Sequence, residues 1–327
     1  MKYVYVLTSS EKDFYYEQFF LSLVSLRLYN PEAEIIVLID EKTKLGLTGK
    51  RSEYEKFSPE IIVIKVPADF SQKEASRWIK TSIHHYVPGD FLFIDCDTII
   101  CENLSYDFPD NIKIGAVLDT HLTLDKHHLR DNFQKEDIGA GFSSSLNTNI
   151  RYNGGLIFCN DDPLALEFFE KWHTLWLESR NRGCSQDMPS LNQANYEMGN
   201  VITELNGEWN CQISHNGLAY LSGAKMIHYY ATSLVSMEPP YRLASSAILG
   251  SIKETGELSD EIIKLLEHPK NAFEPYTRII SDKMVLDALD NSVFFKLIRF
   301  NNRHPRFSGK INSVTSNITR MIKKLFR

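Results

Sequence analysis

The sequence contains few cysteines, and none of them forms a paired motif. The five are Cys96, Cys101, Cys159, Cys184 and Cys211, and no two are separated by only two residues. The spacing therefore gives no sign of a structural zinc site. We expect reduced thiols in a protein of the cytoplasm.

Long hydrophobic runs are also missing. No segment offers the ~18 uninterrupted apolar residues that a membrane-spanning helix needs. The start, MKYVYVLTSSEKD, has only a short apolar run before polar residues, so it predicts a first strand rather than a signal peptide. With 43% hydrophobic and 24% charged residues, the 327-residue chain has the composition of a soluble globular protein with one large domain or two small ones.

The net charge of -6 hides an uneven distribution. Residues 296–327 contain nine Lys and Arg residues and no acid, so the preceding part of the chain carries -15. An acidic body of this kind argues against general binding to nucleic acid. The basic end of the chain requires a separate explanation.

Short apolar runs alternate with helical patterns along the first part of the chain. The runs are YVYVL (3–7), IIVLI (35–39), IIVIKV (61–66) and FLFI (91–94). Between them, hydrophobic residues recur at helical spacing, first from Tyr16 and again from Trp78. Because the apolar runs are continuous rather than alternating, they predict an α/β fold in which helices cover both faces of a parallel sheet.

The next part continues the pattern with one long interruption. IGAVL (114–118) and GLIFC (155–159) are further strand candidates, and a helix is expected from Asp162-Pro163 onward. Residues 120–150, between the two strands, are polar and show no clear period. A connection of that length is usually a lid, a binding loop or a short helical insert.

The run FLFI leads directly into two acids, Asp95 and Asp97, which are separated by Cys96. Ligands of open parallel sheets bind beyond the carboxyl ends of the strands, and these acids are expected at that edge. In extended geometry both carboxylates point the same way, and they repel each other unless a cation lies beside them. The pair therefore indicates a Mn²⁺ or Mg²⁺ site that shares its ion with phosphate, with a solvated turn as the alternative.

An apolar strand followed by Asp-x-Asp, after about ninety residues of alternating strands and helices, resembles the GT-A fold glycosyltransferases. It is most similar to family 8, the retaining galactosyl- and glucosyltransferases that use nucleotide sugars. The resemblance covers roughly residues 1–235. It implies a GT-A domain over 1–244, with a donor-binding half over about 1–100 and an acceptor half over about 101–244. A helical extension over 245–327 would follow.

Two further stretches resemble the donor-binding segments of this family. Arg77 and Lys80 in SRWIKT lie one helical turn apart, where the family has basic residues that contact the donor. Asn153, Gly154 and Gly155 in RYNGGLIFCN resemble the Asn-Ala-Gly stretch that lines the donor sugar. On their own, the first stretch would be a solvated helix face and the second a glycine turn before a strand.

The segment CSQDMPSLN (184–192) resembles the family's Asp-Gln-Asp-x-x-x-Asn stretch. Gln186 and Asp187 carry over as the catalytic pair, with Gln186 near the anomeric carbon and Asp187 on the sugar hydroxyls. Ser185 stands where the family often has its first Asp. The same segment is also compatible with a capped helix start.

A third metal ligand is implied by GAKMIHYY (223–230), which resembles the segment that ends with the family's histidine ligand. The candidate is His228. The Gly and Lys that follow this histidine in the family and bind the diphosphate are absent from YYATSLVS. Either Lys80, Arg242 or a backbone amide replaces them, or the donor site differs from that of the family. GEWN (207–210) resembles the family's Trp-Asn segment.

The loops after the first two strand candidates are expected to hold the base and ribose of the donor. Thr8 and Ser9 follow the first strand, and Asp40 ends the second. These assignments come from position within the resemblance, and ordinary strand-end turns are the alternative. Cys96, between the two acids, is grouped with the donor-binding residues.

The resemblance implies metal-dependent transfer of a hexose from a nucleotide sugar, with UDP as the nucleotide and retention of the anomeric configuration. Mn²⁺ or Mg²⁺ held by Asp95, Asp97 and His228 would neutralise charge on the leaving diphosphate. The acceptor is expected to be a glycan or a lipid-linked saccharide, as in polysaccharide biosynthesis.

The last residues, NSVTSNITRMIKKLFR (312–327), place apolar side chains on one helical face and basic side chains on the rest. This pattern predicts an amphipathic helix on an anionic membrane surface, which would hold the protein peripherally on the cytoplasmic face. A helix packed on the body of the protein or on a partner subunit is the alternative.

Other functions fit parts of the pattern. A haloacid dehalogenase-type phosphatase also has an apolar strand followed by Asp-x-Asp, but that motif usually lies on an early strand, and Ile99 stands where Thr or Val is expected. A non-catalytic nucleotide-sugar-binding protein would fit the missing Gly and Lys after His228. No Gly-rich phosphate loop follows the first strand, which argues against a nucleotidylyltransferase.

Overall fold

The computed structural model of the chain describes residues 1–105, 108–109, 111–127, 129–229, 241–274, 283–293, 295–297 and 300. The chain divides into two compact units. The first comprises Met1–Tyr230 and Pro239–Glu274, and the second comprises Ala231–Glu238 and Pro275–Arg327. The candidate site residues, from Thr8 to His228, all belong to the first unit.

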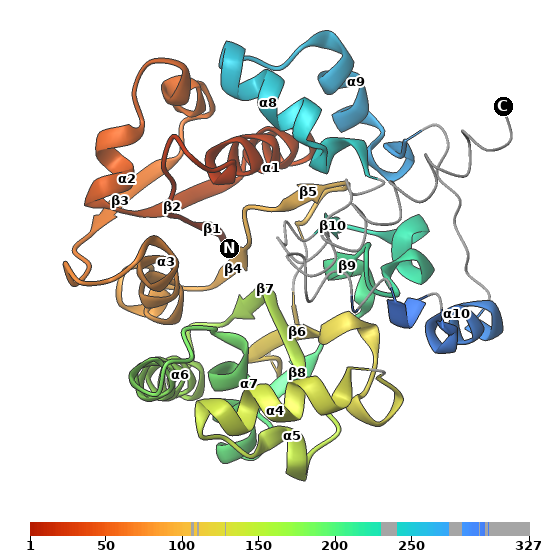
Figure 1. The fold of residues 1–327 in the computed structure, drawn as a ribbon. Helices are drawn as coiled ribbons and strands as arrows, with labels where there is room; N and C mark the ends of the chain where they lie inside the picture. Colours follow the sequence, from red (N-terminus) through yellow and green to blue (C-terminus); the bar gives the residue numbers. More distant parts are fainter. Residues whose placement is uncertain are drawn as a thin grey trace, which may run out of the picture. The chain divides into compact units, whose positions relative to one another are not determined.

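A seven-stranded sheet forms the centre of the first unit (Figure 1), in the order β3-β2-β1-β4-β7-β6-β8. In chain order, the strands are β1 (Lys2–Leu7), β2 (Glu34–Asp40), β3 (Glu60–Ile64), β4 (Phe91–Ile94), β6 (Ile114–Leu118), β7 (Tyr152–Cys159) and β8 (Ile202–Glu204). The four apolar runs predicted as strands in the first hundred residues are therefore strands. They lie side by side and parallel, as expected.

Strand β7 departs from the parallel arrangement, because it runs antiparallel to both β4 and β6. Its pairing sets Ile94 opposite Leu156, and Asp95 N donates a hydrogen bond of 2.8 Å to Gly155 O. The amino end of β7 thus lies beside the carboxyl end of β4. This reversal brings two stretches that are about sixty residues apart, FLFIDCD and RYNGG, to the same edge of the sheet.

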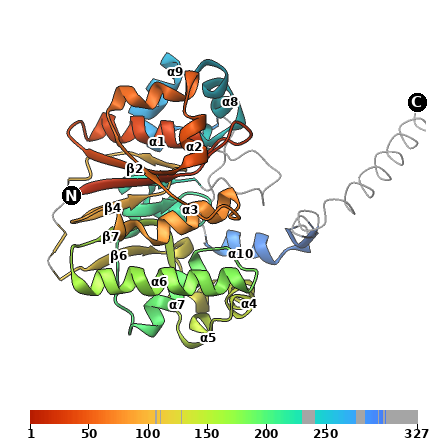
Figure 2. The same ribbon diagram turned by 90° about the vertical axis from the view of Figure 1, so that its left-hand side faces the viewer.

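Helices cover both faces of the sheet, as Figures 1 and 2 show. One face carries α1 (Tyr15–Tyr29), α2 (Glu41–Gly46), α8 (Ser246–Thr255) and α9 (Asp260–Glu267), and the other carries α3 (Gln72–Thr81), α6 (Pro163–Asn181) and α7 (Met188–Glu197). Alternate residues of β1 serve the two cores. Tyr3, Tyr5 and Leu7 pack on the α1 side, and Val4 and Val6 pack on the α3 side.

A second, three-stranded sheet adjoins the end of β4. It contains β5 (Thr98–Ile100), β9 (Cys211–Gln212) and β10 (Met226–His228), with β10 in the middle. The antiparallel pairing of β10 and β5 sets His228 opposite Thr98. Tyr229 N also donates to Asp97 O at 3.2 Å. This small sheet therefore brings His228 next to the Asp-x-Asp segment.

The polar stretch over residues 120–150 is a helical insert, one of the three forms expected for it. It contains α4 (Arg130–Ala140) and α5 (Ser144–Asn147), which follow the single-turn helices η3 (Asp119–His121) and η4 (Leu124–Lys126). The other 3-10 helices are η1 (Gly49–Phe57), η2 (Ile83–His85), η5 (Gly207–Asn210), η6 (Gly217–Gly223), η7 (Arg242–Ala244) and η8 (Pro269–Asn271).

The first helices after residue 245 pack against the domain that was expected over residues 1–244. Lys253 Nζ, on α8, donates to Asp13 O at 2.6 Å, and Tyr29 OH, on α1, donates to Glu267 O at 2.9 Å. Their apolar side chains, among them Leu249 and Ile252, belong to the core on the α1 side. The core of the first unit therefore includes residues on both sides of the boundary expected at 244.

The second unit is described by helix α10 (Lys283–Asn291) and a few residues after it. The basic segment 312–327, predicted as a membrane-surface helix, lies outside the described residues. In the part of the chain that the structure describes, no helix is both long and apolar enough to cross a membrane.

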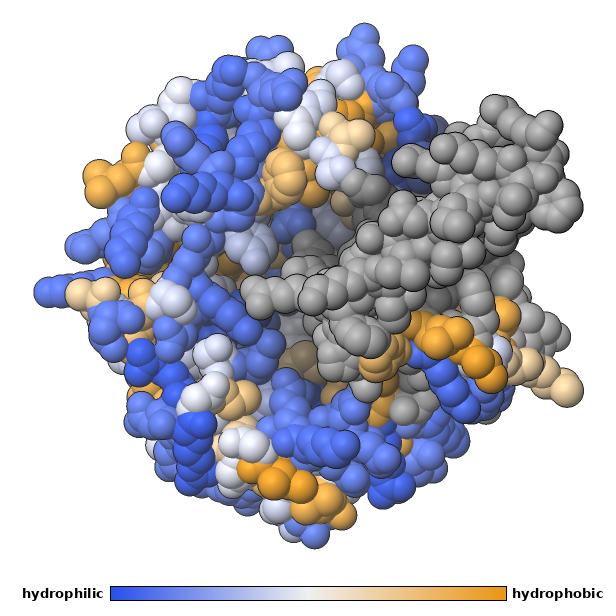
Figure 3. Space-filling view, viewed as in Figure 1, coloured by the Kyte–Doolittle hydropathy of each residue, from blue (hydrophilic) through white to orange (hydrophobic). Residues whose placement is uncertain are grey.

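On the face drawn in Figure 3, most of the coloured surface is hydrophilic, and the apolar spots lie apart from one another.

Candidate active site

Three potential metal ligands meet at the carboxyl end of β4. Asp95 and Asp97 follow this strand, and His228 ends β10. One ligand atom from each of them lies within 4.8 Å of the other two, and His228 Nε2 is 3.2 Å from Asp97 Oδ1. The three residues that the sequence and its resemblance suggested as ligands are therefore neighbours in space.

A buried ion-pair cluster adjoins these ligands. Lys80 Nζ lies 3.2 Å from Asp95 Oδ1 and 2.9 Å from Asp187 Oδ2. Arg77 Nε lies 3.2 Å from Asp187 Oδ1. Both basic residues are on α3, which begins with a complete capping box at Ser71, and their spacing turns both side chains to the sheet edge. Lys80 thus connects the segment after β4 with the start of α7.

Burial and charge act against each other in this cluster. Burial would raise the pKa of Asp187, but Lys80 and Arg77 outweigh it and hold the pKa well below its usual value. Burial raises the pKa of Asp95; Lys80 opposes the rise, and the like charge of Asp97 adds to it. Asp187 is thus a fully compensated anion, whereas Asp95 lacks sufficient positive charge around it.

The donor set fits a divalent cation. Two carboxylates and an imidazole suit Mn²⁺, and Asp95 and Asp97 repel each other without a cation near them. The three carboxylates of the cluster face two permanently charged side chains, Lys80 and Arg77, which leaves one net negative charge when His228 is neutral. A divalent ion would reverse that sign, as a diphosphate ligand requires.

His228 is oriented by a chain of side-chain amides. Its Nδ1 lies 3.0 Å from Asn210 Oδ1, and Asn210 Nδ2 donates to Asn153 Oδ1 at 3.0 Å. A metal-binding histidine is normally fixed by such a contact on its other ring nitrogen. The predicted donor residue Asn153 therefore also supports the predicted ligand His228. Asn210 ends the GEWN segment, and it had no assigned role in the sequence.

The two glycines of β7 lie where side chains would interfere. A Cβ on Gly155 would come within 2.3 Å of His228 Cε1. A Cβ on Gly154 would lie 3.3 Å from Lys80 Nζ and 3.5 Å from Asp187 Oδ2. Gly155 is thus required for close packing against the imidazole, and Gly154 keeps the strand open beside the ion pairs.

The chain of contacts continues into a second buried cluster, which sequence reasoning missed. Asn153 Nδ2 donates to Asp119 Oδ1 at 3.1 Å, and Asp119 Oδ2 lies 3.6 Å from Arg151 Nε. Arg151 also binds Asp137 Oδ1 and Glu136 Oε2 of α4, both at 2.9 Å. A series of contacts therefore runs from the helical insert to His228. Asp119, Glu136 and Asp137 lie outside the motifs of the sequence, and Arg151 opens RYNGGLIFCN without an assigned role, so only the fold connects them.

The loop after Asp119 is strained. Thr120 and His121 both have positive φ, 57° and 59°, in a region that non-glycine residues seldom adopt. Gln212 holds the loop, because its Oε1 accepts from Thr120 N at 2.6 Å and its backbone N donates to His121 Nε2 at 3.1 Å. Such strain is often found at functional sites.

The residues expected to hold the nucleoside form a separate group. Thr8 Oγ1 donates to Gln72 O at 3.1 Å, and Ser9 N donates to Thr43 Oγ1 at 2.9 Å. Asp40 Oδ1 accepts from Thr43 N at 2.9 Å as the N-cap of α2. Asp40 thus ends β2 and caps α2, and its expected role in binding the base or ribose remains a prediction.

The remaining candidates lie at the edges of the site. Gln186 is exposed, directly before the buried Asp187. Cys96 is partly buried, and its Sγ lies 3.4 Å from Val6 O. Arg242, one of the suggested replacements for the diphosphate-binding Lys, pairs with Glu261 between η7 and α9. Of the suggested replacements, Lys80 is the one in contact with the acidic cluster.

Similarity to known proteins comes from structure. No protein-family profile matches the chain, and no curated protein matches it in sequence. The galactosyltransferase LgtC, in complex with donor and acceptor sugar analogues, aligns with 81% of this chain and 99% of its own, at 13% identity and a TM-score of 0.50. The chain has the GT-A fold.

Two other solved structures are similar at lower scores. Mouse xyloside xylosyltransferase 1 covers 70% of this chain and 97% of its own length, at 15% identity and a TM-score of 0.48. The glycosyltransferase GlyE of Streptococcus pneumoniae covers 85% of this chain and 67% of its own, at 15% identity and a TM-score of 0.45. The alignment with LgtC and the strand directions confirm the fold class predicted from the sequence, including a sheet that is mostly parallel.

Sequence reasoning also missed a pair of residues, Asp13 and Gln72, that positions the loop after β1. Asp13 accepts hydrogen bonds from Ser9 Oγ at 2.9 Å and from Gln72 Nε2 at 2.8 Å. Burial would raise the pKa of Asp13, but its hydrogen bonds from Gln72 and Ser10 lower it. The loop is therefore tied to the start of α3, the helix that carries Arg77 and Lys80.

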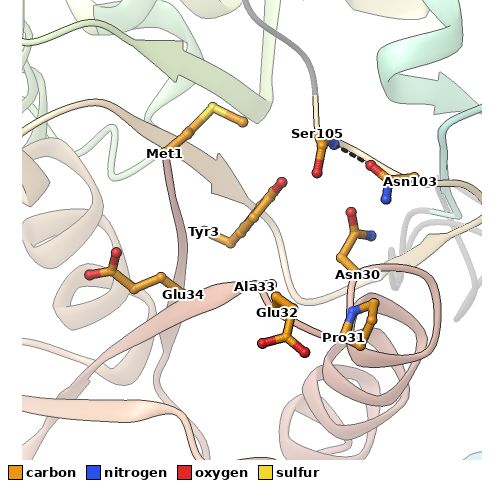
Figure 4. Close-up of a pocket in the computed structure, with 9 residues that line it drawn as sticks. All are labelled: Met1, Tyr3, Asn30, Pro31, Glu32, Ala33, Glu34, Asn103 and Ser105. Atoms are coloured by element: carbon orange, nitrogen blue, oxygen red, sulfur yellow. Dashed lines mark hydrogen bonds between the residues drawn. The ribbon is translucent and has the colours of Figure 1, made fainter.

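A pocket of about 620 Å³ lies at the opposite edge of the sheet (Figure 4). Tyr3 and Glu34, at the amino ends of β1 and β2, and Asn30, just after α1, line it together with Asn103 and Ser105. Because β1 and β2 are parallel, this edge is the one away from the carboxyl ends of the strands. The pocket is therefore separate from the acidic cluster.

Proposed function

We propose that the protein is a metal-dependent glycosyltransferase that moves a hexose from a nucleotide sugar, with UDP as the nucleotide, to a hydroxyl of a glycan or lipid-linked acceptor. The observation that carries this proposal is the cluster of Asp95, Asp97 and His228 beside Lys80 and Asp187. It lies at the sheet edge where ligands of open α/β folds bind. The GT-A fold adds the expectation of a nucleotide-sugar donor.

The ligand residues act on the donor diphosphate. Asp95, Asp97 and His228 would hold Mn²⁺ or Mg²⁺, which supplies positive charge against the phosphate oxygens when bound. Lys80 is buried next to Asp95 and presents a second positive charge to the same place. Because water is largely excluded there, the charge of Lys80 acts more strongly than on the surface.

The sugar-binding residues orient the hexose. The Asp187 carboxylate is held by Lys80 and Arg77, so it stays ionised and accepts hydrogen bonds from sugar hydroxyls. Thr8, Ser9 and Asp40 would contact the ribose and base, and Cys96 is grouped with these donor-binding residues. Gly154 would allow the sugar to approach the backbone of β7, while Gly155 makes room for the His228 ring.

Retention of configuration follows from front-face attack. The acceptor oxygen bonds to the anomeric carbon as the bond to the diphosphate oxygen breaks, and the acceptor proton passes to the leaving phosphate oxygen. The exposed Gln186 lies next to Asp187 in the chain and would orient the acceptor near that carbon. The oxocarbenium-like sugar needs no strong protein nucleophile in this scheme.

The basic segment 312–327 is proposed to hold the enzyme on the cytoplasmic face of a membrane, where lipid-linked acceptors are located. The charge run in the sequence supports this part of the proposal. A test would compare binding to vesicles with and without anionic lipid. Removal of residues 312–327 should abolish the difference between the two vesicle types.

The test of the proposed function is a screen of nucleotide sugars with Mn²⁺ or a chelator, read out as transfer to a sugar acceptor and as slow release of UDP. The matched variants are Asp97→Asn and Asp161→Asn, since Asp161 is an exposed acid after the far end of β7. We expect Mn²⁺-dependent turnover in wild type and Asp161→Asn and its loss in Asp97→Asn. Binding of a nucleotide sugar without turnover would favour the non-catalytic alternative. Release of phosphate from aryl phosphates alone would favour the phosphatase.

A further inference from the structure

A second group of possible metal ligands lies outside the site described above. His84 and His85 belong to η2, directly after α3, and Glu170 belongs to α6. One ligand atom from each lies within 4.8 Å of the other two. His84 Nε2 is 3.1 Å from Glu170 Oε1, and His85 Nε2 is 3.3 Å from the same oxygen.

These distances match a tetrahedral metal site. In a tetrahedron with metal–ligand bonds of about 2.0–2.1 Å, neighbouring ligand atoms lie roughly 3.3–3.4 Å apart. The two separations between a histidine Nε2 and Glu170 Oε1 are close to that length without an ion. Two imidazoles and one carboxylate, with a water molecule in the fourth position, form a common zinc ligand set.

The imidazoles are held in place by packing. The His84 ring lies 3.9 Å from the His85 ring and 5.5 Å from the ring of Phe169, and its side chain is only 4% exposed. The site thus has one fixed buried ligand, and two ligands at the surface can adjust.

The ligand types separate this group from the acidic cluster. Imidazole nitrogen favours Zn²⁺, Ni²⁺ or Cu²⁺, whereas a carboxylate-rich set with phosphate suits Mn²⁺ or Mg²⁺. Among the described residues, none of His84, His85 and Glu170 bonds to Asp95 or Asp97. A metal at one place would therefore leave the other group of ligands available.

We propose that His84, His85 and Glu170 bind a single borderline divalent ion, Zn²⁺ in the first instance, and that the ion clamps η2 to α6. The clamp would act on the same helix pair that frames the ion-pair cluster. Helix α3, just before η2, carries Lys80, and Trp172 Nε1 on α6 donates to Asp187 O at 3.2 Å. The role of the ion is structural, and it does not depend on the proposed glycosyltransferase activity.

One feature of the site limits its affinity. His84 Nδ1 is buried with no hydrogen-bond partner in the described part of the chain. Binding through Nε2 puts the ring proton on that nitrogen, where most metal-bound histidines have an acceptor. The site should therefore be filled at micromolar rather than nanomolar free Zn²⁺.

The experiment uses the full chain with Asp97→Asn, which disables the acidic cluster, and follows Co²⁺ by its visible absorption and Zn²⁺ by calorimetry. Glu170→Gln is the test substitution, and Glu167→Gln is the matched control, because it changes an exposed acid one turn earlier on α6. Glu170 and Glu167 are both exposed, so we expect both variants to fold. His85→Asn, at a ring that is 46% exposed, provides a second test.

We expect one tetrahedral Co²⁺ or one Zn²⁺ per chain in Asp97→Asn, unchanged affinity with Glu167→Gln, and at least tenfold weaker binding with Glu170→Gln or His85→Asn. Zn²⁺ should also raise Tm in the control but not in the two test variants. Equal Zn²⁺ affinity and equal Tm shifts in all variants would overturn the proposal, and would show that the three side chains are joined only by hydrogen bonds.

Discussion

Two buried cationic side chains, Lys80 and Arg151, each lie among carboxylates. Lys80 is beside the candidate metal ligands, and Arg151 is beside the helical insert. Lys80 is 3% exposed and contacts Asp95 and Asp187. Arg151 is 2% exposed and contacts three acids, two of them on α4. The two clusters are similar in composition, but different groups surround their carboxylates.

Exposure and pKa do not separate the two clusters, because burial raises the pKa of Glu136 as well as that of Asp95, and their side chains are 33% and 30% exposed. Asp137, in the Arg151 cluster, is fully buried and also accepts from Ser144 Oγ at 3.1 Å. Asp95 instead lies with Asp97 and His228 as one of three possible metal ligands, a grouping that the described acids around Arg151 do not form. The Arg151 cluster thus fixes the helical insert to the start of β7, whereas the Lys80 cluster is suited to take up a cation and a phosphate. Composition alone does not distinguish a structural cluster from a binding site.

The largest effect on stability is expected from Arg151→Met. The change leaves the buried Asp137 without its charged partner, which should reduce the free energy of unfolding by about 3–5 kcal/mol. Urea unfolding of the purified protein measures this. The double variant Asp137→Asn with Arg151→Met should recover part of the loss. An unchanged midpoint in the single variant would mean that the cluster does not hold the insert.

Lys80→Met should behave differently. Asp187 keeps Arg77 as a partner, so we expect a smaller loss of less than about 3 kcal/mol. Removing one positive charge makes the cluster more negative, so added Mn²⁺ should raise Tm more than it does in wild type, while sugar transfer is lost. The Mn²⁺ series of thermal scans should show no such recovery in Arg151→Met. Equal responses of both variants would erase the distinction between the clusters.

The glycine pair of β7 gives a matched comparison within the Lys80 side. Gly155→Ala places a Cβ 2.3 Å from His228 Cε1 and must displace the ring, so Mn²⁺ affinity should fall by about 10- to 100-fold. Gly154→Ala meets the flexible end of Lys80 at 3.3 Å and Asp187 Oδ2 at an ordinary contact distance of 3.5 Å, and should change Mn²⁺ affinity much less. Calorimetry on both variants decides this, and a reversed order would place His228 away from the metal.

The smallest effect concerns two partly buried histidines, His173 and His121. Burial lowers the pKa of His173, on α6, and of His121, after β6, from 6.5 to about 4 in both cases. Because each folded-state pKa lies below its unfolded value, stability should be complete above pH 6.5 and fall as the pH drops toward 4. Urea midpoints from pH 7 to 4.5 should decline less steeply in His173→Gln than in wild type.

The sequence was informative where short-range patterns determine structure. Continuous apolar runs predicted β1 to β4, and the acids at the end of β4 were expected at the functional edge. His228, Arg77, Lys80 and Asn153 could be proposed only through the family resemblance, and the fold brings all four to that edge. Local patterns thus predict well where a strand lies and which face a helix buries.

The rest depended on long-range topology. The antiparallel direction of β7 places Gly155 beside Asp95, and no local pattern in RYNGG encodes that direction. The Arg151 cluster joins Arg151, which opens RYNGGLIFCN without an assigned role, to acids of η3 and α4, which carry no motif. The helix cap at Asp40 was also not expected from the sequence, which placed this residue only at a strand end, and its part in binding the nucleoside remains a prediction.

The central claim is that Asp95, Asp97 and His228 bind one divalent cation together with the donor diphosphate. The most direct measurement is a Mn²⁺ titration followed by electron paramagnetic resonance, with and without UDP, on wild type and Asp97→Asn. We expect one bound Mn²⁺ per wild-type chain, tightened by UDP, and loss of both effects in Asp97→Asn. UDP binding that is the same in a chelator and in Asp97→Asn would contradict the account.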